Sequence, residues 1–360
     1  MFLDQLKIRG FKNFENQVFD FKKKVNCFIG SNGVGKTNIL DAIYHLSFGK
    51  SFLSQTKDCL GFRQDTFFIE GSFTDDKKYE KIICSFQKSK NKKTLFRNDK
   101  PYKKLSNHIG LIPTVVVSPI DRDIIIGHGS DRRKFIDGII SQTNIAFLDS
   151  LIQYNKTLLQ RNSYLKSCKI NGSFDEILID SLNQQLIRYG SGLYHQRKSF
   201  LKKYIPFFKK HYHHICSGQE TVDIDYKSHL DDHEFETLLT NSITQDLALG
   251  HTSKGLHRDD LHFYLNQNQL RKFGSQGQQK SFITALKFAQ YEFLKTETQK
   301  SPLLLLDDAF DRLDQQRVEQ IINLIDKNAF SQIFLTDTHL NRTKETLGNV
   351  STDFEIFQLH

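Results

Sequence analysis

The sequence predicts an α/β fold, with a mainly parallel sheet, an antiparallel subdomain and an inserted helical lobe. Three observations predict it: a glycine-rich loop lies between a short apolar run and an amphipathic segment, strand-like and helix-like segments alternate at both ends of the chain, and a helical period dominates the middle. We therefore expect residues 1–130 and 247–360 to form one lobe and residues 131–246 to form the helical lobe.

The glycine-rich loop reads Gly30-Ser31-Asn32-Gly33-Val34-Gly35-Lys36-Thr37 and fits the pattern G-x-x-x-x-G-K-[ST]. The apolar run 25–29 is typical of a buried strand, and residues 37–46 have the spacing of a helix. In this order, backbone N–H groups and the helix N-terminus can surround a phosphate chain. Lys36 would reach the β and γ oxygens and Thr37 would bind Mg²⁺. The loop therefore predicts an ATP site.

Composition limits the class of protein without identifying it. The 360 residues include 50 Lys and Arg against 41 Asp and Glu, a net charge of +9 that is compatible with an anionic partner. The cysteines are scattered and form no C-x-x-C pair, which argues against a disulfide framework and a structural zinc site. Neither a signal peptide nor a run of membrane-spanning length is evident. We expect a cytoplasmic protein with no membrane partner.

Alternating apolar and polar residues predict strands at 2–9, 16–21, 67–73 and 81–86, and the last two suggest an antiparallel sheet beside the nucleotide core. The lysine-rich segment 88–104 follows. Two interpretations fit it equally well: a solvated sheet edge protected by charge, or a surface that contacts phosphates.

After a strand-like run at 111–118, two apolar stripes predict two long antiparallel helices. One stripe contains Ile145, Leu148, Leu151, Ile152, Leu158, Leu159 and Leu165, and the other contains Leu178, Leu182, Leu186, Leu193 and Leu201. Pro206 should kink or stop the second helix. Beyond this lobe, apolar runs at 261–265, 302–308 and 331–337 predict strands that alternate with helices and complete the sheet.

Two further stretches carry candidate chemistry. A buried strand ends in Asp307 and Asp308, so Asp307 could complete the Mg²⁺ shell with Thr37, and Asp308 could activate the attacking water. The stretch Ser275-Gln276-Gly277-Gln278 opens a helix that Ser275 can cap, which makes a second phosphate clamp. One chain rarely needs two clamps for one triphosphate. We therefore expect a two-fold homodimer in which each subunit's ATP site is closed by its partner's clamp.

These stretches, with Asp311-Arg312-Leu313-Asp314, resemble the Walker A, signature, Walker B and D-loop motifs of a P-loop ABC-type ATPase head. Further short motifs, spread along the whole chain, resemble those of the RecF family of bacterial recombination and repair proteins. They are Gly49-Lys50-Ser51-Phe52, Ser118-Pro119 with Asp121-Arg122-Asp123, Asp131-Arg132-Arg133-Lys134-Phe135-Ile136-Asp137, Leu159-Gln160-Arg161-Asn162 and Gly255-Leu256-His257-Arg258-Asp259-Asp260.

The resemblance implies an SMC-like head that dimerises on ATP, binds double-stranded DNA, hydrolyses ATP slowly, and helps RecO and RecR to load RecA at gaps beside duplex. It implies D-loop roles for Asp311 and Asp314. Two departures stand out: Asp308 lies where ABC heads usually have glutamate, and the switch strand offers both Asp337 and His339 as the γ-phosphate sensor. Gln64 is a candidate sensor glutamine.

Three alternatives belong to other classes. An ATPase subunit of a membrane transporter would carry a helical insertion of about half this length. A full SMC protein would need a far longer coiled coil. An SMC-like structural DNA clamp would use ATP only as dimer glue, without significant turnover; the absence of hydrolysis with DNA present would favour it over a weak, DNA-stimulated ATPase.

Overall fold

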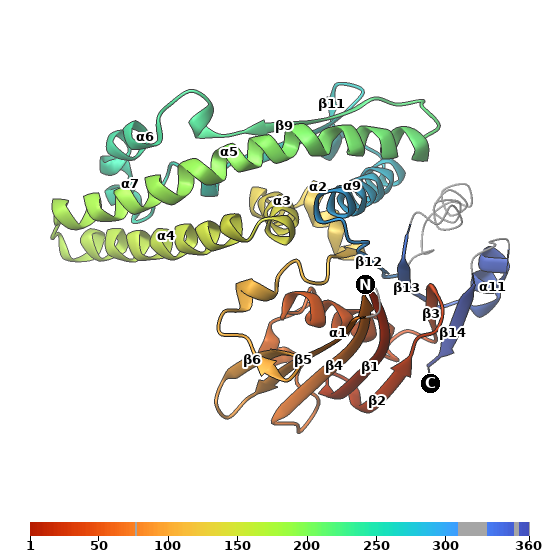
Figure 1. The fold of residues 1–360 in the computed structure, drawn as a ribbon. Coiled ribbons are helices and arrows are strands. Elements are labelled where there is room, and N and C mark those ends of the chain that lie inside the picture. Colours follow the sequence, from red (N-terminus) through yellow and green to blue (C-terminus); the bar gives the residue numbers. More distant parts are fainter. Residues whose placement is uncertain (76–77, 309–329, 349–352, 360) are drawn as a thin grey trace. The chain divides into compact units, whose positions relative to one another are not determined.

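A computed structural model describes residues 1–75, 78–308, 330–348 and 353–359 (Figure 1). By contacts between Cα atoms the chain divides into two compact units: Met1–Asp121 with Lys280–His360, and Arg122–Gln279. Residues 122–130 and 247–279 thus group with the helical segment. The sequence analysis places these stretches in the ATPase lobe with residues 1–121 and 280–360, and that assignment stays a prediction.

The first unit contains a parallel sheet with strand order β14-β3-β13-β12-β8, as the alternation of strands and helices predicts. Its strands are β3 (Val25–Ile29), β8 (Thr114–Val117), β12 (Leu303–Leu306), β13 (Gln332–Asp337) and β14 (Phe354–Gln358). Every residue of β3, β12 and β13 is buried. This is why these strands contain consecutive apolar residues rather than an alternating pattern.

An antiparallel sheet with order β2-β1-β4-β5-β6-β7 completes the first unit and confirms the predicted antiparallel subdomain. Its strands are β1 (Phe2–Phe11), β2 (Phe14–Asp20), β4 (Thr66–Asp75), β5 (Lys78–Gln87), β6 (Lys92–Arg97) and β7 (Lys100–Pro101). Helix α1 (Lys36–Phe48) contacts β1, β4 and β5 of this sheet and β8 and β13 of the parallel one. Its apolar side chains Ile39, Leu40, Ile43 and Leu46 are fully buried. Helix α1 is therefore held between two sheets, and the glycine loop that precedes it is anchored at the N-terminus of α1.

The remaining elements of the first unit are short. They are the 3₁₀ turns η1 (Thr56–Cys59), η2 (Leu105–His108) and η3 (Pro119–Arg122), and helix α11 (Leu340–Gly348).

The second unit is mainly helical. Its elements are α2 (Asp123–Ile126), α3 (Gly129–Thr143), α4 (Ile145–Asn171), α5 (Glu176–Ile215), η4 (His229–Asp231), α6 (Phe235–Asn241), α7 (Ile243–Leu249), η5 (Leu256–Arg258) and α8 (Leu270–Phe273), with strands β9 (Val222–Lys227), β10 (Asp260–Leu265) and β11 (Asn268–Gln269). The strands form an antiparallel sheet in the order β11-β10-β9. Helix α9 (Gln276–Thr298) begins in this unit and continues into the other.

Helices α4 and α5 form the antiparallel pair that the sequence predicts (Figure 1). Two details differ from expectation. Helix α5 continues through Pro206 to Ile215, so of the two predicted outcomes the stop is wrong and the kink stays a prediction; a proline removes one backbone donor, which a 40-residue helix packed on α4 tolerates. In α4, most of the predicted apolar stripe is not buried: Leu159 is 71% exposed.

The buried face of α4 carries Leu165 of that stripe together with Phe147, Tyr154, Thr157, Arg161 and Cys168. Arg161 is fully buried because its guanidinium donates to Asp246 Oδ2 at 2.7 Å, Thr252 Oγ1 at 2.7 Å and Asn183 Oδ1 at 2.8 Å. An arginine with this many acceptors can enter a core from which an unpaired one is excluded. Apolar spacing alone therefore identified only part of the buried face.

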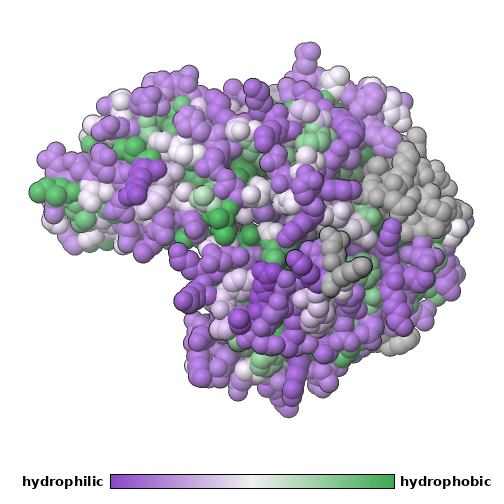
Figure 2. Space-filling model, viewed as in Figure 1, coloured by the Kyte–Doolittle hydropathy of each residue, from purple (hydrophilic) through white to green (hydrophobic). Residues whose placement is uncertain are grey.

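The visible surface is mostly hydrophilic, with apolar residues in small groups (Figure 2). Within the part of the chain that the structure describes, none of the helices combines the length and the apolar character needed to cross a bilayer.

Candidate nucleotide-binding site and signature turn

The glycine loop connects the end of β3 to the start of α1, as the sequence predicts. Gly33 and Gly35 have φ of 91° and 106°, a region that residues with a Cβ rarely adopt. At Gly35 a Cβ would also lie 2.4 Å from Asn13 Nδ2 and 2.9 Å from Phe14 Cζ. Glycine is thus required there both by the backbone and by the close approach of the turn between β1 and β2.

Lys36 folds back over the loop that precedes it. Its Nζ donates to the carbonyl oxygens of Gly30 at 2.8 Å and Ser31 at 2.9 Å, and the residue is 6% exposed. The ammonium group is thus held beside the loop, within which the lysine of P-loop proteins contacts the β- and γ-phosphates.

Asp307, at the end of β12, meets Thr37 at the start of α1. Its Oδ1 accepts hydrogen bonds from Thr37 Oγ1 at 2.8 Å and from Thr336 Oγ1 at 2.9 Å. Burial raises the pKa of Asp307, although the hydrogen bonds from Thr37 and Thr336 act in the opposite direction. A buried carboxylate beside a hydroxyl offers the hard oxygen donors that Mg²⁺ prefers. The two residues predicted to hold the metal therefore lie together and fit it chemically.

Asp308 follows Asp307 in an unusual backbone conformation. Its φ is 50°, which aspartate tolerates better than most residues, and its N–H donates to Thr336 Oγ1 at 2.8 Å. Thr336 thus holds both carboxylate residues at the end of β12, one through the side chain and one through the backbone. The D-loop residues Asp311 and Asp314 lie outside the described residues.

The two switch candidates differ in accessibility. Asp337 is 1% exposed and accepts hydrogen bonds from Arg342, from Thr343 Oγ1 at 2.7 Å and from Thr338 N at 2.8 Å. These partners use Asp337 to anchor the start of α11. His339 is exposed. The geometry thus favours His339 over Asp337 as the γ-phosphate sensor, and the assignment stays a prediction. Gln64, the candidate sensor glutamine, is exposed.

Sequence reasoning missed Asn13, which supports the glycine loop from the turn between β1 and β2. Its Nδ2 donates to Val34 O at 3.0 Å, and its Oδ1 accepts from Asn38 Nδ2 at 2.7 Å. Asn13 thereby links the loop to the first turn of α1. No local pattern in the sequence marks this residue.

Asp41, on α1, is a second residue that sequence reasoning missed. It is fully buried, pairs with Lys12 Nζ at 2.6 Å and accepts from Ser51 Oγ and Phe52 N. This network accounts for the phrase Gly49-Lys50-Ser51-Phe52 as a support for α1. A charged residue on an otherwise apolar helix face was the signal that could have found it.

The predicted signature turn lies at the start of α9. Ser275 caps the helix as predicted: its Oγ accepts from Gln278 N at 3.2 Å, and its own N–H donates to Gln278 Oε1 at 2.8 Å. Ser275 and Gln276 are exposed, and Gly277 is half-buried. The turn therefore presents a hydroxyl and a helix N-terminus to its surroundings. Its action on a partner subunit's nucleotide stays a prediction.

The lysine-rich segment 88–104 spans β6 and the edge strand β7. Its exposed basic residues are Lys88, Lys90, Lys92, Lys100, Lys103 and Lys104. Arg97 instead donates to Glu80 at 2.5 and 2.9 Å, so its charge is used within the sheet. Both interpretations of the exposed lysines, edge protection and phosphate contact, stay open.

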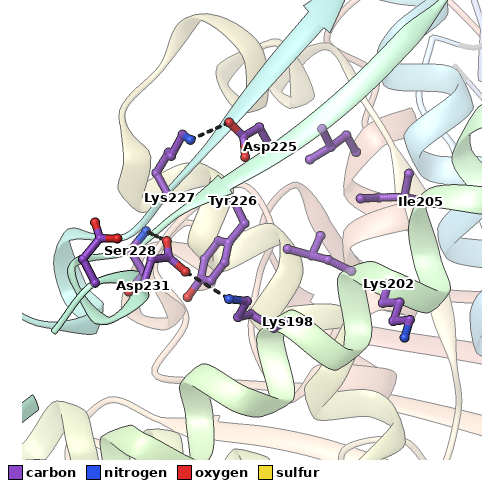
Figure 3. Close-up of a pocket in the computed structure, with 11 residues that line it drawn as sticks. Lys198, Lys202, Ile205, Asp225, Tyr226, Lys227, Ser228 and Asp231 are labelled. Atoms are coloured by element: carbon purple, nitrogen blue, oxygen red, sulfur yellow. Dashed lines mark hydrogen bonds and ion pairs between the residues drawn. The ribbon is translucent and has the colours of Figure 1, made fainter. Parts of the chain in front are cut away.

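A pocket of about 550 Å³ lies between α5 and β9 in the second unit (Figure 3). Two of its lysines are paired: Lys198 with Asp231 at 3.1 Å and Lys227 with Asp225 at 2.9 Å. The pocket lacks a glycine loop, and these lysine charges are already neutralised. It is therefore distinct from the predicted nucleotide site.

Comparison with known proteins gives matches along nearly the whole chain. The family described as RecF/RecN/SMC N terminal domain matches residues 2–356. Among curated relatives, the DNA replication and repair protein RecF of Flavobacterium johnsoniae is 44% identical over 360 residues, covering 100% of both chains. The RecF of Parabacteroides distasonis is 42% identical, covering 100% of this chain and 97% of its own.

Solved structures give the same result. A structure of the recombination mediator protein RecF with ATPrS, in the RecFOR pathway, aligns with a TM-score of 0.88 and 31% identity, covering 100% of this chain and 96% of its own. An Smc head bound to the C-winged helix domain of ScpA aligns with a TM-score of 0.57 at 15% identity, covering 99% of this chain and 94% of its own. The second likeness concerns the fold alone.

Proposed function

Because the chain belongs to the RecF family of DNA replication and repair proteins, whose fold is that of SMC/ABC-type ATPases, we propose that it is an ATP-controlled clamp for double-stranded DNA. The observation that carries the proposal is the 2.8 Å hydrogen bond between Thr37 of the glycine loop and Asp307 of β12. It joins the predicted phosphate site to the predicted metal site.

Within the ATP site, each residue has a distinct task. Lys36 binds the β- and γ-phosphates, and Thr37 and Asp307 hold Mg²⁺, which supplies charge neutralisation at the phosphates when bound. Asp308 orients and deprotonates the attacking water. Aspartate is one methylene shorter than the glutamate usual in ABC heads, so the carboxylate reaches less far and turnover is slow.

Dimerisation uses the signature turn. Ser275 and the N-terminus of α9 contact the γ-phosphate held by the partner subunit, so two ATP molecules lie in one two-fold interface. ATP therefore controls whether two subunits stay together, and hydrolysis releases them.

Duplex DNA is the partner that the net charge of +9 and the family membership support. The closed dimer binds at the junction of duplex and single-stranded gap and assists RecO and RecR in loading RecA. The recombination mediator role described for solved RecF structures supports this proposal.

The test is duplex-DNA binding, measured by fluorescence anisotropy with ATP, with ADP and without nucleotide, over a salt series. We expect tight binding only with ATP, weakening steeply as salt rises. Lys36→Ala should abolish the effect of ATP, whereas Lys57→Ala, an exposed lysine on η1, should leave it unchanged. Binding that does not depend on nucleotide would refute the clamp.

The same DNA complex separates this function from a clamp that uses ATP only as dimer glue. Phosphate release in the presence of DNA is expected for the switch. Complete absence of phosphate release, with normal ATP-dependent DNA binding, would favour a clamp in which ATP only holds the dimer together.

A further inference from the structure

The side chain of Gln278 is hydrogen-bonded at both ends. Its Oε1 accepts from the N–H of Ser275 at 2.8 Å, and its Nε2 donates to Glu220 Oε1 at 2.6 Å. A capping box needs only the first of these bonds. The second joins the signature turn to a residue 58 positions earlier in the chain, just before β9.

Glu220 is held in turn by α5. Tyr212, in the last turns of that helix, is fully buried and donates from Oη to Glu220 Oε2 at 2.5 Å. Burial, with the hydrogen bond to Glu220, raises the pKa of Tyr212, so the phenol remains a donor at neutral pH. A continuous chain of hydrogen bonds therefore runs from the core of α5 through Glu220 and Gln278 to the backbone of Ser275.

We propose that Glu220 is a positioning residue for the signature turn: it fixes Gln278, and through it the orientation of Ser275, for contact with the partner subunit's phosphate. This inference rests on the proposed function, in which the turn acts in trans. Ser275 and Gln276 are exposed; besides the bond from Gln279 Nε2 to Gly274 O at 3.0 Å, the turn is supported through the contact of Gln278 with Glu220. Loss of that support would leave the capping box formed but free to reorient.

The two-fold dimer amplifies the effect. Each dimer contains two signature turns, so a substitution weakens two equivalent contacts at once. The two factors multiply in the dimerisation constant. A threefold weakening of each contact would therefore weaken ATP-dependent dimerisation about tenfold. Nucleotide binding to the separate subunit, which uses the glycine loop, should not change.

Exchanging the carboxylate of Glu220 and the amide of Gln278 gives a reciprocal test. Glu220→Ala removes the acceptor. Glu220→Gln keeps both contacts, because its amide oxygen accepts from Gln278 and its NH₂ donates to Tyr212 Oη, which can accept. Gln278→Glu keeps the cap but places two carboxylates face to face. Combining Gln278→Glu with Glu220→Gln restores a donor opposite an acceptor.

Two readouts are measured on the full chain. Hydrogen–deuterium exchange over residues 270–282, without nucleotide, reports the order of the turn independently of dimerisation. Light scattering with ATP gives the concentration at which half the protein is dimeric. ATP affinity of the monomer is the internal reference, and Glu236→Ala, an exposed residue on α6, is the matched control.

We expect Glu220→Ala and Gln278→Glu to speed exchange at the turn and to raise the half-dimer concentration about tenfold, with unchanged ATP affinity. Glu220→Gln and the double variant should behave like wild type. If Glu220→Ala matches wild type, or the double variant fails to recover, the positioning role is refuted. A wild-type protein that stays monomeric with ATP would instead refute the proposed function, and with it the role of Glu220 in the dimer.

Discussion

Replacing Asp307 by asparagine should separate the stability of the protein from its use of Mg²⁺. Asp307 is 8% exposed, and only its Oδ1 receives the hydroxyls of Thr37 and Thr336, at 2.8 and 2.9 Å. An asparagine oxygen can accept both bonds with no change of shape. The substitution therefore removes the charge and little else.

The sign of the effect on the nucleotide-free protein follows from the pKa. Burial raises the pKa of Asp307 in the folded state, so ionisation of this carboxyl favours the unfolded chain. Folding stability therefore falls as pH rises from the pKa of Asp307 in the unfolded chain to its higher pKa in the folded protein. At neutral pH the ionised carboxylate is thus a net cost without a cation. We expect Asp307→Asn to raise the Tm of the nucleotide-free protein.

With ATP and Mg²⁺, the wild-type protein should have a higher Tm than Asp307→Asn. A ligand present at 100 times its Kd stabilises the folded state by about 2.7 kcal/mol. For a unit of about 200 residues, this is a Tm increase of roughly 5–11 °C. The part of this increase that requires Mg²⁺, measured as the difference between Mg²⁺ and EDTA, should be lost in Asp307→Asn.

The assay is thermal unfolding followed by dye fluorescence, with ATP and either Mg²⁺ or EDTA. Asp308→Asn is the matched control, because it changes the neighbouring carboxylate, which is assigned to water activation rather than to the metal. A Mg²⁺-dependent shift of wild-type size in Asp307→Asn would refute the metal assignment.

Three further predictions concern the nucleotide cycle and pH. Ser275→Arg should leave ATP affinity unchanged but abolish ATP-induced dimers in light scattering, and a variant that dimerises normally would contradict the shared site. Asp308→Asn should reduce phosphate release at least tenfold and prolong the ATP-bound dimer; undiminished release would remove Asp308 from the role of base. His45 and His108 are fully buried, and burial lowers the pKa of each to about 4 from 6.5. Protons thus bind the unfolded chain more readily, so stability should be lost as pH falls from about 6.5 to about 4, by on the order of 3 kcal/mol per histidine. His108→Gln, which can still donate to Leu46 O, should flatten the decline of Tm over this interval.

The elements predicted well from sequence are those whose evidence is local. The glycine loop, the Ser275 cap and the apolar strands that end at Asp307 and Asp337 each depend on a few consecutive residues. β14 was missed. It is a five-residue strand at the end of the chain, and it pairs with β3, more than 300 residues away.

The candidate site also contains residues with local sequence evidence and residues that depend on distant segments. Lys36, Thr37 and Asp307 were assigned from motifs, and the structure brings them together. Asn13 and Glu220 were not assigned, because each acts through a contact with a segment distant in the chain. The α4 stripe was incomplete for the same reason: Arg161 is buried by acceptors on three other segments.

The sequence by itself therefore determined the phosphate loop, the order of strands and helices and the family, because backbone conformation and hydrophobic period are properties of neighbouring residues. Only the tertiary structure decided which polar side chains are buried, which hydrogen bonds support the loop and the signature turn, and that Asp337 is occupied by Arg342 and Thr343. A buried polar group needs a partner, and that partner can come from anywhere in the chain once the chain has folded.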